Sequence, residues 1–296
     1  MLDIERLFTE TGVVHERMNR RGTVNLGCPK CGSRDNLAWL SRRQYFRCWS
    51  CGVLPTVETI AQLTGLSAPT IPALLKKYQT RHVQAQEEVL KGGATTLTYP
   101  DGTGPLLPAH LAYLKGRGLD PDQVQEEFGP IYGTGPMAAE LPNRIIFPLY
   151  LEGKAVSWQA RSIHPQCDQK YRYHTCPPDK EIIHHKNIAY GLDGVAGESV
   201  LICEGVFDVM KMGRGCCHLF GISWLNVQLN ELANRFSSVY VMFDSEPGAQ
   251  ASGKRLAEAL SGLGVISVII DPECVKDPGE WPIEQARAVR KQLLGF

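Results

Sequence analysis

The segment Val200-Leu201-Ile202-Cys203-Glu204-Gly205-Val206-Phe207-Asp208 decides the fold class of this chain. It begins with four residues typical of a buried strand, and a carboxylate follows them without a spacer. A second apolar run, at residues 238–243, leads in the same way into Asp244. Strands that alternate with helices predict a mainly parallel sheet covered on both faces. The expected fold class is therefore α/β.

Predicted strands and helices alternate along the whole C-terminal part. Strands are expected at residues 199–203, 217–220, 238–243 and 265–270. Helices are expected between them, at residues 207–212, 227–236 and 248–263. The carboxyl ends of parallel strands lie at one edge of a sheet, and ligands bind in the crevice outside those ends. Side chains that directly follow these strands are therefore candidates for a functional site.

Acidic side chains follow three of these strands. The candidate catalytic set consists of Glu204, Asp208, Asp244, Glu246 and Asp277. Carboxylates that gather at one edge repel one another unless a divalent cation lies between them, and Mg²⁺ prefers a few carboxylates, water and a substrate phosphate. This is the chemistry of metal-assisted phosphoryl transfer. The alternative is that the acids cap helices, but three sets in series favour a metal site.

Two Cys-x-x-Cys pairs lie near the N-terminus, Cys28-Pro29-Lys30-Cys31 and Cys48-Trp49-Ser50-Cys51. Each pair forms a tight turn that offers two sulfur atoms, and a glycine follows each pair. Two such turns on facing hairpins predict one structural Zn²⁺ in a closed tetrahedral site. A redox motif or unrelated core cysteines are the alternatives, and the paired spacing favours zinc.

Charge is unevenly distributed along the 296 residues. Lys plus Arg (31) equals Asp plus Glu (31), so the total neither favours nor excludes a nucleic-acid partner. Residues 17–52, however, contain eight basic residues and one acid, Asp35. Cations mixed with aromatic rings can hold phosphates and stack bases of a single strand. The expected template-binding residues are Arg42, Arg43, Arg47 and Trp49. The alternative is that Phe46 and Trp49 form the small core of the ribbon.

A basic middle region lies between these two parts. Helices are expected at residues 108–116 and 121–128, and strands at residues 144–151 and 155–161. Arg and Lys in this region can offset phosphate charge. The candidate nucleotide-binding or primer-binding residues are Arg144, Arg161, Lys170 and Lys186.

The expected domain organisation has four parts. Residues 1–78 form a zinc-ribbon domain, and residues 79–105, with the breakers Gly92-Gly93 and Pro100-Asp101-Gly102, form a linker. Residues 106–196 form a mixed α+β subdomain, and residues 197–296 form the parallel-sheet subdomain. The N-terminus lacks an apolar signal region and no apolar run is long enough to span a membrane, so we expect a cytosolic, reduced protein with no membrane partner.

The order of motifs resembles that of DnaG-type bacterial and phage DNA primases. In the middle region, residues 110–119 resemble the family's "YLxxRG" helix, residues 143–149 its "RIxFP" strand and residues 158–161 its "FxxR" strand. Lys170-Tyr171, and Lys186 with residues 189–192, resemble the "KY" and "K…LYGL" elements. In the C-terminal part, residues 203–208 resemble "EGYxD", residues 243–250 "FDxDxAGxxA" and residues 276–278 "KDPD", the motifs of a TOPRIM domain. The Cys₄ ribbon is most similar to the primase half of phage primase–helicase proteins.

This resemblance implies a DNA primase, a DNA-directed RNA polymerase of the primosome that makes short RNA primers on single-stranded DNA from NTPs. It implies one Zn²⁺ and two or more Mg²⁺ (or Mn²⁺) ions, the latter held by Glu204, Asp244, Glu246 and Asp277. It also implies a separate replicative helicase as partner and a location in the bacterial or phage-infected cytoplasm. Two residues depart from the family pattern, because Glu246 and Gly279 each occupy a position where Asp is usual.

Two other functions remain open from the residues alone. A TOPRIM nuclease would use the carboxylates but would not explain the basic middle region. A non-catalytic recombination or replication mediator also joins a Cys₄ module to a TOPRIM domain, but such proteins lack the "RIxFP" and "KY" elements. Incorporation of ribonucleotides on a single-stranded template separates the three functions.

Overall fold

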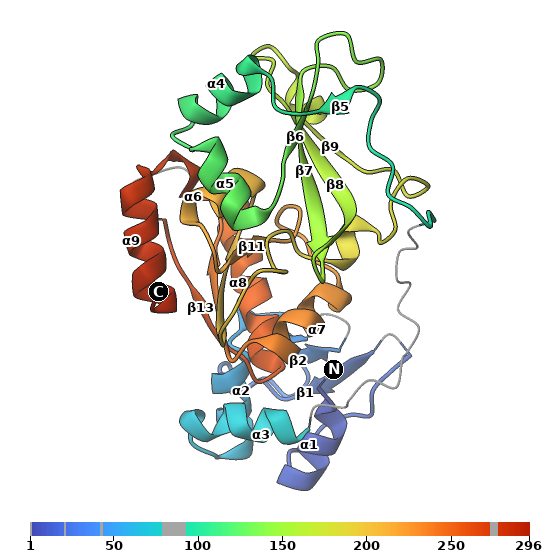
Figure 1. Ribbon diagram of the computed structural model, residues 1–296. Helices are drawn as coiled ribbons and strands as arrows, with labels where there is room; N and C mark the ends of the chain where they lie inside the picture. Colours follow the sequence, from blue (N-terminus) through green and yellow to red (C-terminus); the bar gives the residue numbers. More distant parts are fainter. Residues whose placement is uncertain (1, 21, 42–43, 79–92, 273–277) are drawn as a thin grey trace. The chain divides into compact units, whose positions relative to one another are not determined.

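The computed structural model describes residues 2–20, 22–41, 44–78, 93–272 and 278–296 (Figure 1). The chain forms two compact units, which are described separately. The first comprises Met1–Glu87, Leu229–Val241 and Glu246–Ile270, and the second comprises Glu88–Gln228, Met242–Ser245 and Asp271–Phe296. The predicted boundaries at 78/79, 105/106 and 196/197 stay a prediction, and most of the predicted linker lies outside the described residues.

The N-terminal part of the first unit is an antiparallel sheet of order β1-β2-β3-β4 with three helices. Its strands are β1 (Thr23–Leu26), β2 (Leu37–Leu40), β3 (Tyr45–Cys48) and β4 (Gly52–Leu54). Its helices are α1 (Ile4–Thr11), α2 (Thr56–Thr64) and α3 (Ile71–Lys77), with the 3₁₀ turn η1 (Ala68–Thr70) before α3. Alternation in the sequence predicts short strands at residues 23–26, 37–40 and 45–48, and the first three strands confirm this prediction to the residue. The short strand β4 was not predicted.

Aromatic side chains form the core of this ribbon. Phe8, Trp39 and Phe46 are fully buried, and the rings of Trp39 and Phe46 lie 4.8 Å apart. Helix α1 places Phe8 in this core, and the Asp3 carboxylate caps the helix by accepting from the Arg6 N–H at 3.1 Å. The alternative that Phe46 and Trp49 form the ribbon core holds for Phe46, whereas Trp49 is 72% exposed.

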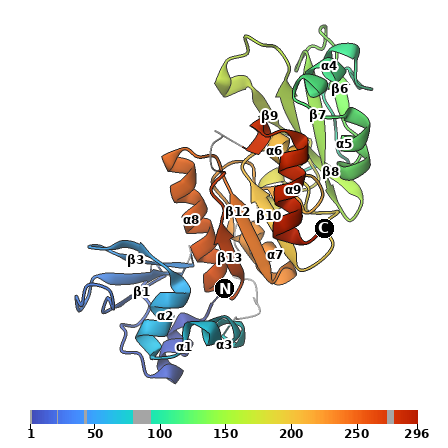
Figure 2. The same cartoon turned by 90° about the vertical axis from the view of Figure 1, so that its left-hand side faces the viewer.

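The same unit contains α7 (Asn226–Arg235) from Leu229 onward, most of β12 (Ser238–Met242), α8 (Pro247–Gly262) and β13 (Ile266–Ile269). Helix α8 contacts β13 on one side and α2 and β3 of the ribbon on another (Figure 2). At the ribbon contact the backbone of Gly262 approaches closely, because an added Cβ would lie 2.7 Å from the Gln44 carbonyl oxygen. The Thr56 N–H at the start of α2 also donates to the Glu258 carboxylate on α8 at 2.6 Å.

The N-terminal part of the second unit is an antiparallel sheet of order β5-β6-β7-β8-β9. Its strands are β5 (Thr103–Gly104), β6 (Tyr132–Thr134), β7 (Arg144–Leu151), β8 (Lys154–Ser162) and β9 (Tyr173–Thr175). Helices α4 (Pro108–Gly116) and α5 (Pro121–Phe128) and the 3₁₀ turns η2 (Gln169–Tyr171) and η3 (His185–Asn187) accompany it. The predicted β7–β8 hairpin and both helices are confirmed, and the Asp193 carboxylate accepts from the two N–H groups of the Glu152-Gly153 turn.

Parallel strand pairs occur in both units, and in the first unit β12 pairs in parallel with β13. Strand β10 (Ser199–Cys203) pairs in parallel with β11 (Cys216–His218), and α6 (Val206–Met212) connects them. The 3₁₀ turn η4 (Pro278–Glu280) and α9 (Ile283–Leu294) complete the described chain, and α9 was not predicted. The expected α/β class with a parallel sheet is confirmed. The strand predicted at residues 217–220 ends earlier, because Phe220 has a φ of 64° and its N–H bonds the His218 side chain instead of a neighbouring strand.

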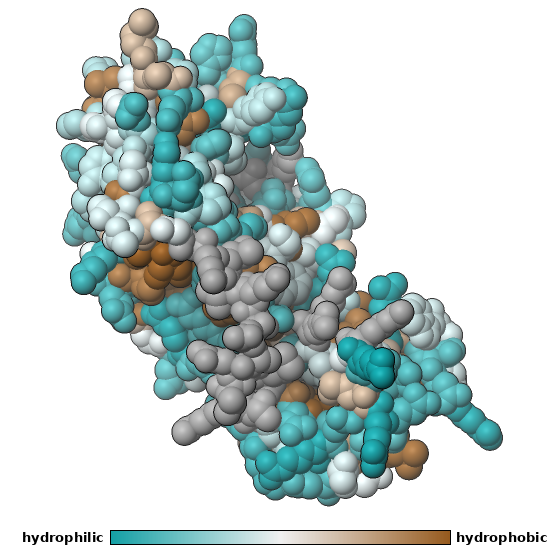
Figure 3. All heavy atoms as spheres, turned by 90° about the vertical axis from the view of Figure 1, so that its right-hand side faces the viewer, coloured by the Kyte–Doolittle hydropathy of each residue, from teal (hydrophilic) through white to brown (hydrophobic). Residues whose placement is uncertain are grey.

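Hydrophilic side chains dominate the described part of the face shown in Figure 3, with hydrophobic ones in small separate patches. Single large apolar side chains do reach the surface, among them Val14 at 91% and Met137 at 92% exposure. Within the described ranges, no helix is both long enough and apolar enough to cross a membrane.

Candidate functional site

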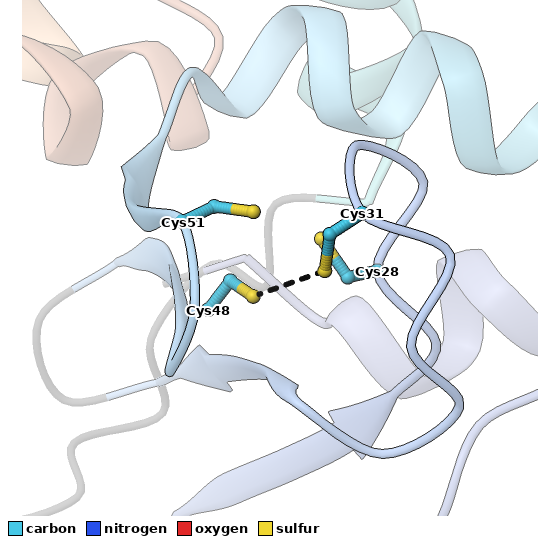
Figure 4. A group of neighbouring side chains, drawn as sticks. All are labelled: Cys28, Cys31, Cys48 and Cys51. Atoms are coloured by element: carbon cyan, nitrogen blue, oxygen red, sulfur yellow. Dashed lines mark hydrogen bonds between the residues drawn. The ribbon is translucent and has the colours of Figure 1, made fainter.

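Four cysteine side chains meet in the ribbon. Cys28 and Cys31 lie in the β1–β2 loop, Cys48 is the last residue of β3, and Cys51 directly precedes β4. The four sulfur atoms face a common centre (Figure 4). All four sulfur atoms lie within 4.8 Å of one another, and those of Cys31 and Cys48 are 3.8 Å apart. Gly32, at a left-handed φ of 70°, lets its N–H return to the Cys28 carbonyl at 2.9 Å and closes the first turn.

These distances fit a tetrahedral zinc ion. Zn–S bonds of about 2.3 Å place sulfur atoms about 3.8 Å apart in a regular tetrahedron. The ligands must be thiolates, so binding of the ion releases protons. A hydrogen bond from the Ser33 backbone lowers the pKa of Cys31 to about 6. In contrast, burial raises the pKa of Cys28 and raises that of Cys51 to about 12. Two of the four cysteines, Cys28 and Cys48, are buried, as in a closed structural site. The predicted Cys₄ zinc-binding site is therefore present.

The predicted template-binding residues lie near this cluster in sequence. Trp49 is exposed, and the Arg47 guanidinium carbon lies 5.7 Å from the centre of its ring. A stacked, exposed Arg–Trp pair has the composition of a single-strand binding surface. Arg42 and Arg43 lie outside the described residues. The template role of all four stays a prediction.

A cavity of about 410 Å³ lies within the second unit. Its lining contains three guanidinium groups and three carboxylates, from Arg117, Arg161, Arg172, Glu204, Asp208 and Asp244. We refer to it as the arginine–carboxylate cavity. Hard oxygen ligands next to anion-binding guanidinium groups suit a phosphorylated ligand with its divalent cation.

Two of the carboxylates reach this cavity from the ends of strands, and the third from a helix. Glu204 directly follows β10, as expected, and Asp208 lies in the first turn of α6. One oxygen of Asp208 accepts from the Gly205 N–H at 2.8 Å, so this acid also serves as the predicted alternative, a helix cap. Asp244 follows β12 and lines the same cavity.

The remaining two acids are placed differently. Glu246 is the N-cap residue of α8 and belongs to the first unit. Asp277 lies outside the described residues. The described structure thus brings three of the five candidate acids to one cavity.

Arg161 is the predicted basic residue that lines the cavity. Its side chain is 8% exposed, and its guanidinium carbon lies 4.6 Å from the Tyr173 ring centre and 5.6 Å from that of Phe207. Arg117 lies over the Phe207 ring at 4.3 Å. Aromatic rings that hold two guanidinium groups fix their direction at little entropic cost.

The other predicted phosphate-binding residues have different surroundings. Arg144 donates to the Arg172 and Tyr171 carbonyl oxygens at 3.2 and 2.8 Å, and burial lowers its pKa. Lys186 donates to the Phe220 carbonyl oxygen at 2.9 Å, and burial also lowers its pKa. Lys170 is exposed, with its ammonium nitrogen 3.8 Å from the Asp168 carboxylate. None of the three lines the cavity.

Sequence reasoning missed several cavity residues. Arg117, Gln159, Arg172 and His218 line it without having been selected. The signal for Arg117 was available, because it stands in the helix that resembles "YLxxRG". Nothing in the sequence distinguishes His218 from a histidine of the protein core.

Glu181, His184 and His185 form a second group with metal-ligating side chains. The buried Glu181 carboxylate accepts from the Ser157 hydroxyl at 2.5 Å and lies 3.3 Å from His185 Nδ1. His184 Nδ1 accepts from the Lys186 N–H at 3.1 Å, so Nε2 carries the proton in the neutral ring and lies 3.8 Å from the carboxylate. A protonated nitrogen is no metal ligand. We therefore interpret this group as a carboxylate that orients two histidine rings.

Comparison with known proteins identifies the fold. No family model matches the chain, and no curated protein matches it. Among solved structures, the crystal structure of the Aquifex aeolicus primase (zinc-binding and RNA polymerase domains) aligns over 99% of this chain and 83% of that one, with a TM-score of 0.53 and 16% identity. This chain has the fold of DnaG primases.

Structures of the DnaG catalytic region alone give the same result. The E. coli primase catalytic core aligns over 62% of this chain and 72% of its own, with a TM-score of 0.51 and 17% identity. A DnaG primase catalytic domain bound to ssDNA aligns over 63% and 72%, with a TM-score of 0.51 and 16% identity. The predicted resemblance to the zinc-binding and RNA polymerase domains of DnaG is confirmed at the level of fold.

Proposed function

We propose that this protein is a DNA primase that synthesises short RNA primers on single-stranded DNA by metal-dependent nucleotidyl transfer. The observation that carries the proposal is the arginine–carboxylate cavity, in which three guanidinium groups and three carboxylates share one lining. A triphosphate with its cations matches both halves of that lining. The shared DnaG fold and the Cys₄ site support the same function.

Each part of the cavity has a proposed role. Arg117, Arg161 and Arg172 bind the triphosphate and hold it in line for attack. Glu204 and Asp244 are the proposed Mg²⁺ ligands of the cavity. Glu246 and Asp277, which the TOPRIM motifs also contain, are proposed as further ligands. Bound Mg²⁺ would stabilise the charge that develops when a primer 3′-hydroxyl attacks the α-phosphate. Asp208 holds the Gly205 turn and so positions Glu204.

Residues outside the cavity are proposed to support these groups. Arg144 holds the backbone at Tyr171 and Arg172, which orients one cavity guanidinium and presents the exposed Lys170 to the primer strand. Lys186 holds the Phe220 carbonyl. The zinc ribbon, with Arg42, Arg43, Arg47 and Trp49, is proposed to bind the template, because exposed cations and an indole ring suit an unpaired strand. A replicative helicase is the proposed further partner.

The decisive experiment is primer synthesis with labelled NTPs on a panel of single-stranded templates that covers every trinucleotide. We expect short RNA products with Mg²⁺ or Mn²⁺, and none after chelation of the divalent cation. Template binding without any dinucleotide product, with both metals and all templates, would refute the enzyme and favour a non-catalytic mediator. Strand cleavage without synthesis would favour a TOPRIM nuclease.

A further inference from the structure

His218 ends strand β11 and lines the arginine–carboxylate cavity together with Glu204 and Asp244. Its side chain is 1% exposed. In a buried histidine of a polar cavity, both ring nitrogens normally form hydrogen bonds. The two nitrogens of His218 differ sharply in this respect.

The Nδ1 atom fixes the tautomer of the ring. It lies 3.1 Å from the backbone nitrogen of Phe220, whose N–H can only donate, so Nδ1 accepts and Nε2 carries the proton. Burial, with a smaller effect of the Lys186 charge, lowers the pKa of His218 to about 3. The ring is therefore neutral near pH 7, and Nε2–H is a permanent donor.

The Nε2–H group is buried and has no hydrogen-bond partner among the described residues. The rings around it are those of Tyr190, at 5.2 Å between centroids, and Phe220, at 4.7 Å. A buried donor without an acceptor carries a free-energy cost. An acceptor that arrives with a ligand of the cavity would remove this cost.

The turn after His218 is strained at the same place. Phe220 has a φ of 64°, a conformation that side chains other than glycine rarely adopt. Both sides of this residue are held, its N–H by His218 Nδ1 and its carbonyl oxygen by Lys186 Nζ at 2.9 Å. Phe220 and Gly221 themselves line the cavity. Residues with a strained backbone that is held in place by hydrogen bonds on both sides often occur at ligand-binding sites.

We propose that His218 binds the nucleotide directly, with Nε2–H donating a hydrogen bond to a phosphate oxygen of the triphosphate. This inference rests on the proposed function of the cavity and adds a contact to it. A phosphate oxygen is the matching acceptor, because the guanidinium groups of the same lining also only donate. Since Nε2 is buried, entry of the phosphate must displace part of the wall, and the strained Phe220 turn is the part that moves.

The competing explanation is that His218 only holds the turn through Nδ1. Two substitutions separate these roles. His218→Asn keeps a short acceptor that can bond the N–H two residues on, but it has no group at the Nε2 position. His218→Gln places an amide N–H₂ near the Nε2 position and lacks the short acceptor. The asparagine variant therefore removes the proposed contact while it preserves the turn.

Nucleotide affinity gives the first test, measured by calorimetry with ATP, dATP and inorganic tripolyphosphate in the presence of Mg²⁺ and the absence of template. We expect His218→Asn to weaken all three about tenfold, the loss of one hydrogen bond to a charged acceptor. His164→Asn is the matched control, because His164 Nδ1 accepts from Gln166 N–H in the same way at 3.2 Å but lies outside the cavity. It should bind like the wild type.

The outcomes distinguish this inference from the proposed function. Wild-type binding with unchanged affinity in a folded His218→Asn variant would overturn the contact and leave the nucleotide site intact. A loss confined to ATP, with dATP and tripolyphosphate unaffected, would overturn the phosphate assignment. A wild-type protein that binds none of the three would refute the proposed function itself.

A second measurement needs no variant. In protein labelled with ¹⁵N-histidine, long-range ¹H–¹⁵N spectra should show His218 as the Nε2–H tautomer. Tripolyphosphate with Mg²⁺ should move the Nε2 proton resonance downfield, as expected on formation of a hydrogen bond. A purely structural ring would keep its resonance, and that result would overturn the proposal.

Discussion

The zinc ribbon and the arginine–carboxylate cavity bring polar side chains together in different ways. The four cysteines lie in two tight turns within 24 residues of sequence, and every ligand predicted from their spacing is in place. The cavity draws its charged residues from positions 117 to 244, and sequence reasoning identified four of its six charged residues. The residues of a site formed by local turns can be predicted from their sequence spacing. The residues of a site formed by packing of strands and helices can be predicted only where a sequence motif contains them.

The largest effect is expected in the ribbon. Cys48→Ser should remove the bound zinc and unfold residues 1–78, because such modules gain on the order of 10 kcal/mol from the metal. Zinc content, measured by atomic emission, should fall from one equivalent to none. Thermal unfolding should show the second unit still folding cooperatively. Retention of one zinc by Cys48→Ser would refute the ribbon site.

This substitution also tests the packing of α8. Because α2 and β3 contact this helix, loss of the ribbon should expose its last turns, near Gly262, to hydrogen exchange. Cys167→Ser is the matched control, since this half-exposed cysteine belongs to neither pair. It should keep the zinc and the protection.

The next largest effect is expected in the cavity. Asp244→Asn removes a charge from the proposed metal site with little change in shape, so primer synthesis should fall at least a thousandfold, or about 4 kcal/mol in activation free energy. Glu246→Asp, which restores the residue usual in the DnaG family, should retain activity. Near-wild-type synthesis by Asp244→Asn would contradict the assignment of the carboxylates.

A smaller effect is expected from the guanidinium groups. Arg161→Met keeps the apolar stem and removes the charge, so triphosphate affinity should fall about tenfold to a hundredfold. Arg144→Met is an informative partner variant, because Arg144 is equally buried but bonds backbone carbonyls. It should lower the melting temperature more than the affinity. If Arg144→Met lowers the triphosphate affinity more than Arg161→Met does, and lowers the melting temperature less, then Arg144 is the direct ligand.

The smallest effect concerns the Glu258 carboxyl. Burial raises its pKa to about 7, so the folded state binds this proton more tightly than the unfolded chain does. Stability should therefore be full below about pH 4.5 and fall as the pH rises toward and through 7. In Glu258→Gln the amide oxygen can still accept from the Thr56 N–H. The free energy of unfolding of this variant at pH 8 should be about 1 kcal/mol higher than that of the wild type. Equal pH slopes in denaturant titrations of the two proteins would contradict this.

The sequence predicted most strand positions and some of the residues that line the cavity. Strands β1, β2, β3, β7 and β10 were located to the residue, and a glycine or a glutamate directly follows β1, β7 and β10. Strand β11 was predicted too long, since the Phe220 turn depends on a side-chain hydrogen bond that apolar patterning does not encode. Short strands such as β5 and β9 carry too few residues for a periodic signal.

The candidate site shows the same division. Glu204 and Asp244 were predictable because each directly follows an apolar strand. Arg172 and Lys170 are near neighbours in sequence, and only the packing around Arg144 shows which of them lines the cavity. The neutral tautomer of His218 depends on a backbone N–H that only the folded chain presents.

The close approach of Gly262 to the ribbon has a mechanical consequence. Helix α8 runs for 16 residues from Pro247 to Gly262, about 24 Å at 1.5 Å per residue, and its N-cap residue is Glu246. Two contacts hold the last turns of this helix against the ribbon: Gly262 packs against the Gln44 backbone, and the Glu258 carboxylate accepts from the Thr56 N–H. A force applied to the ribbon, for example by a bound nucleic-acid strand that moves, would therefore be transmitted along helix α8 to Glu246 at its N-terminal end.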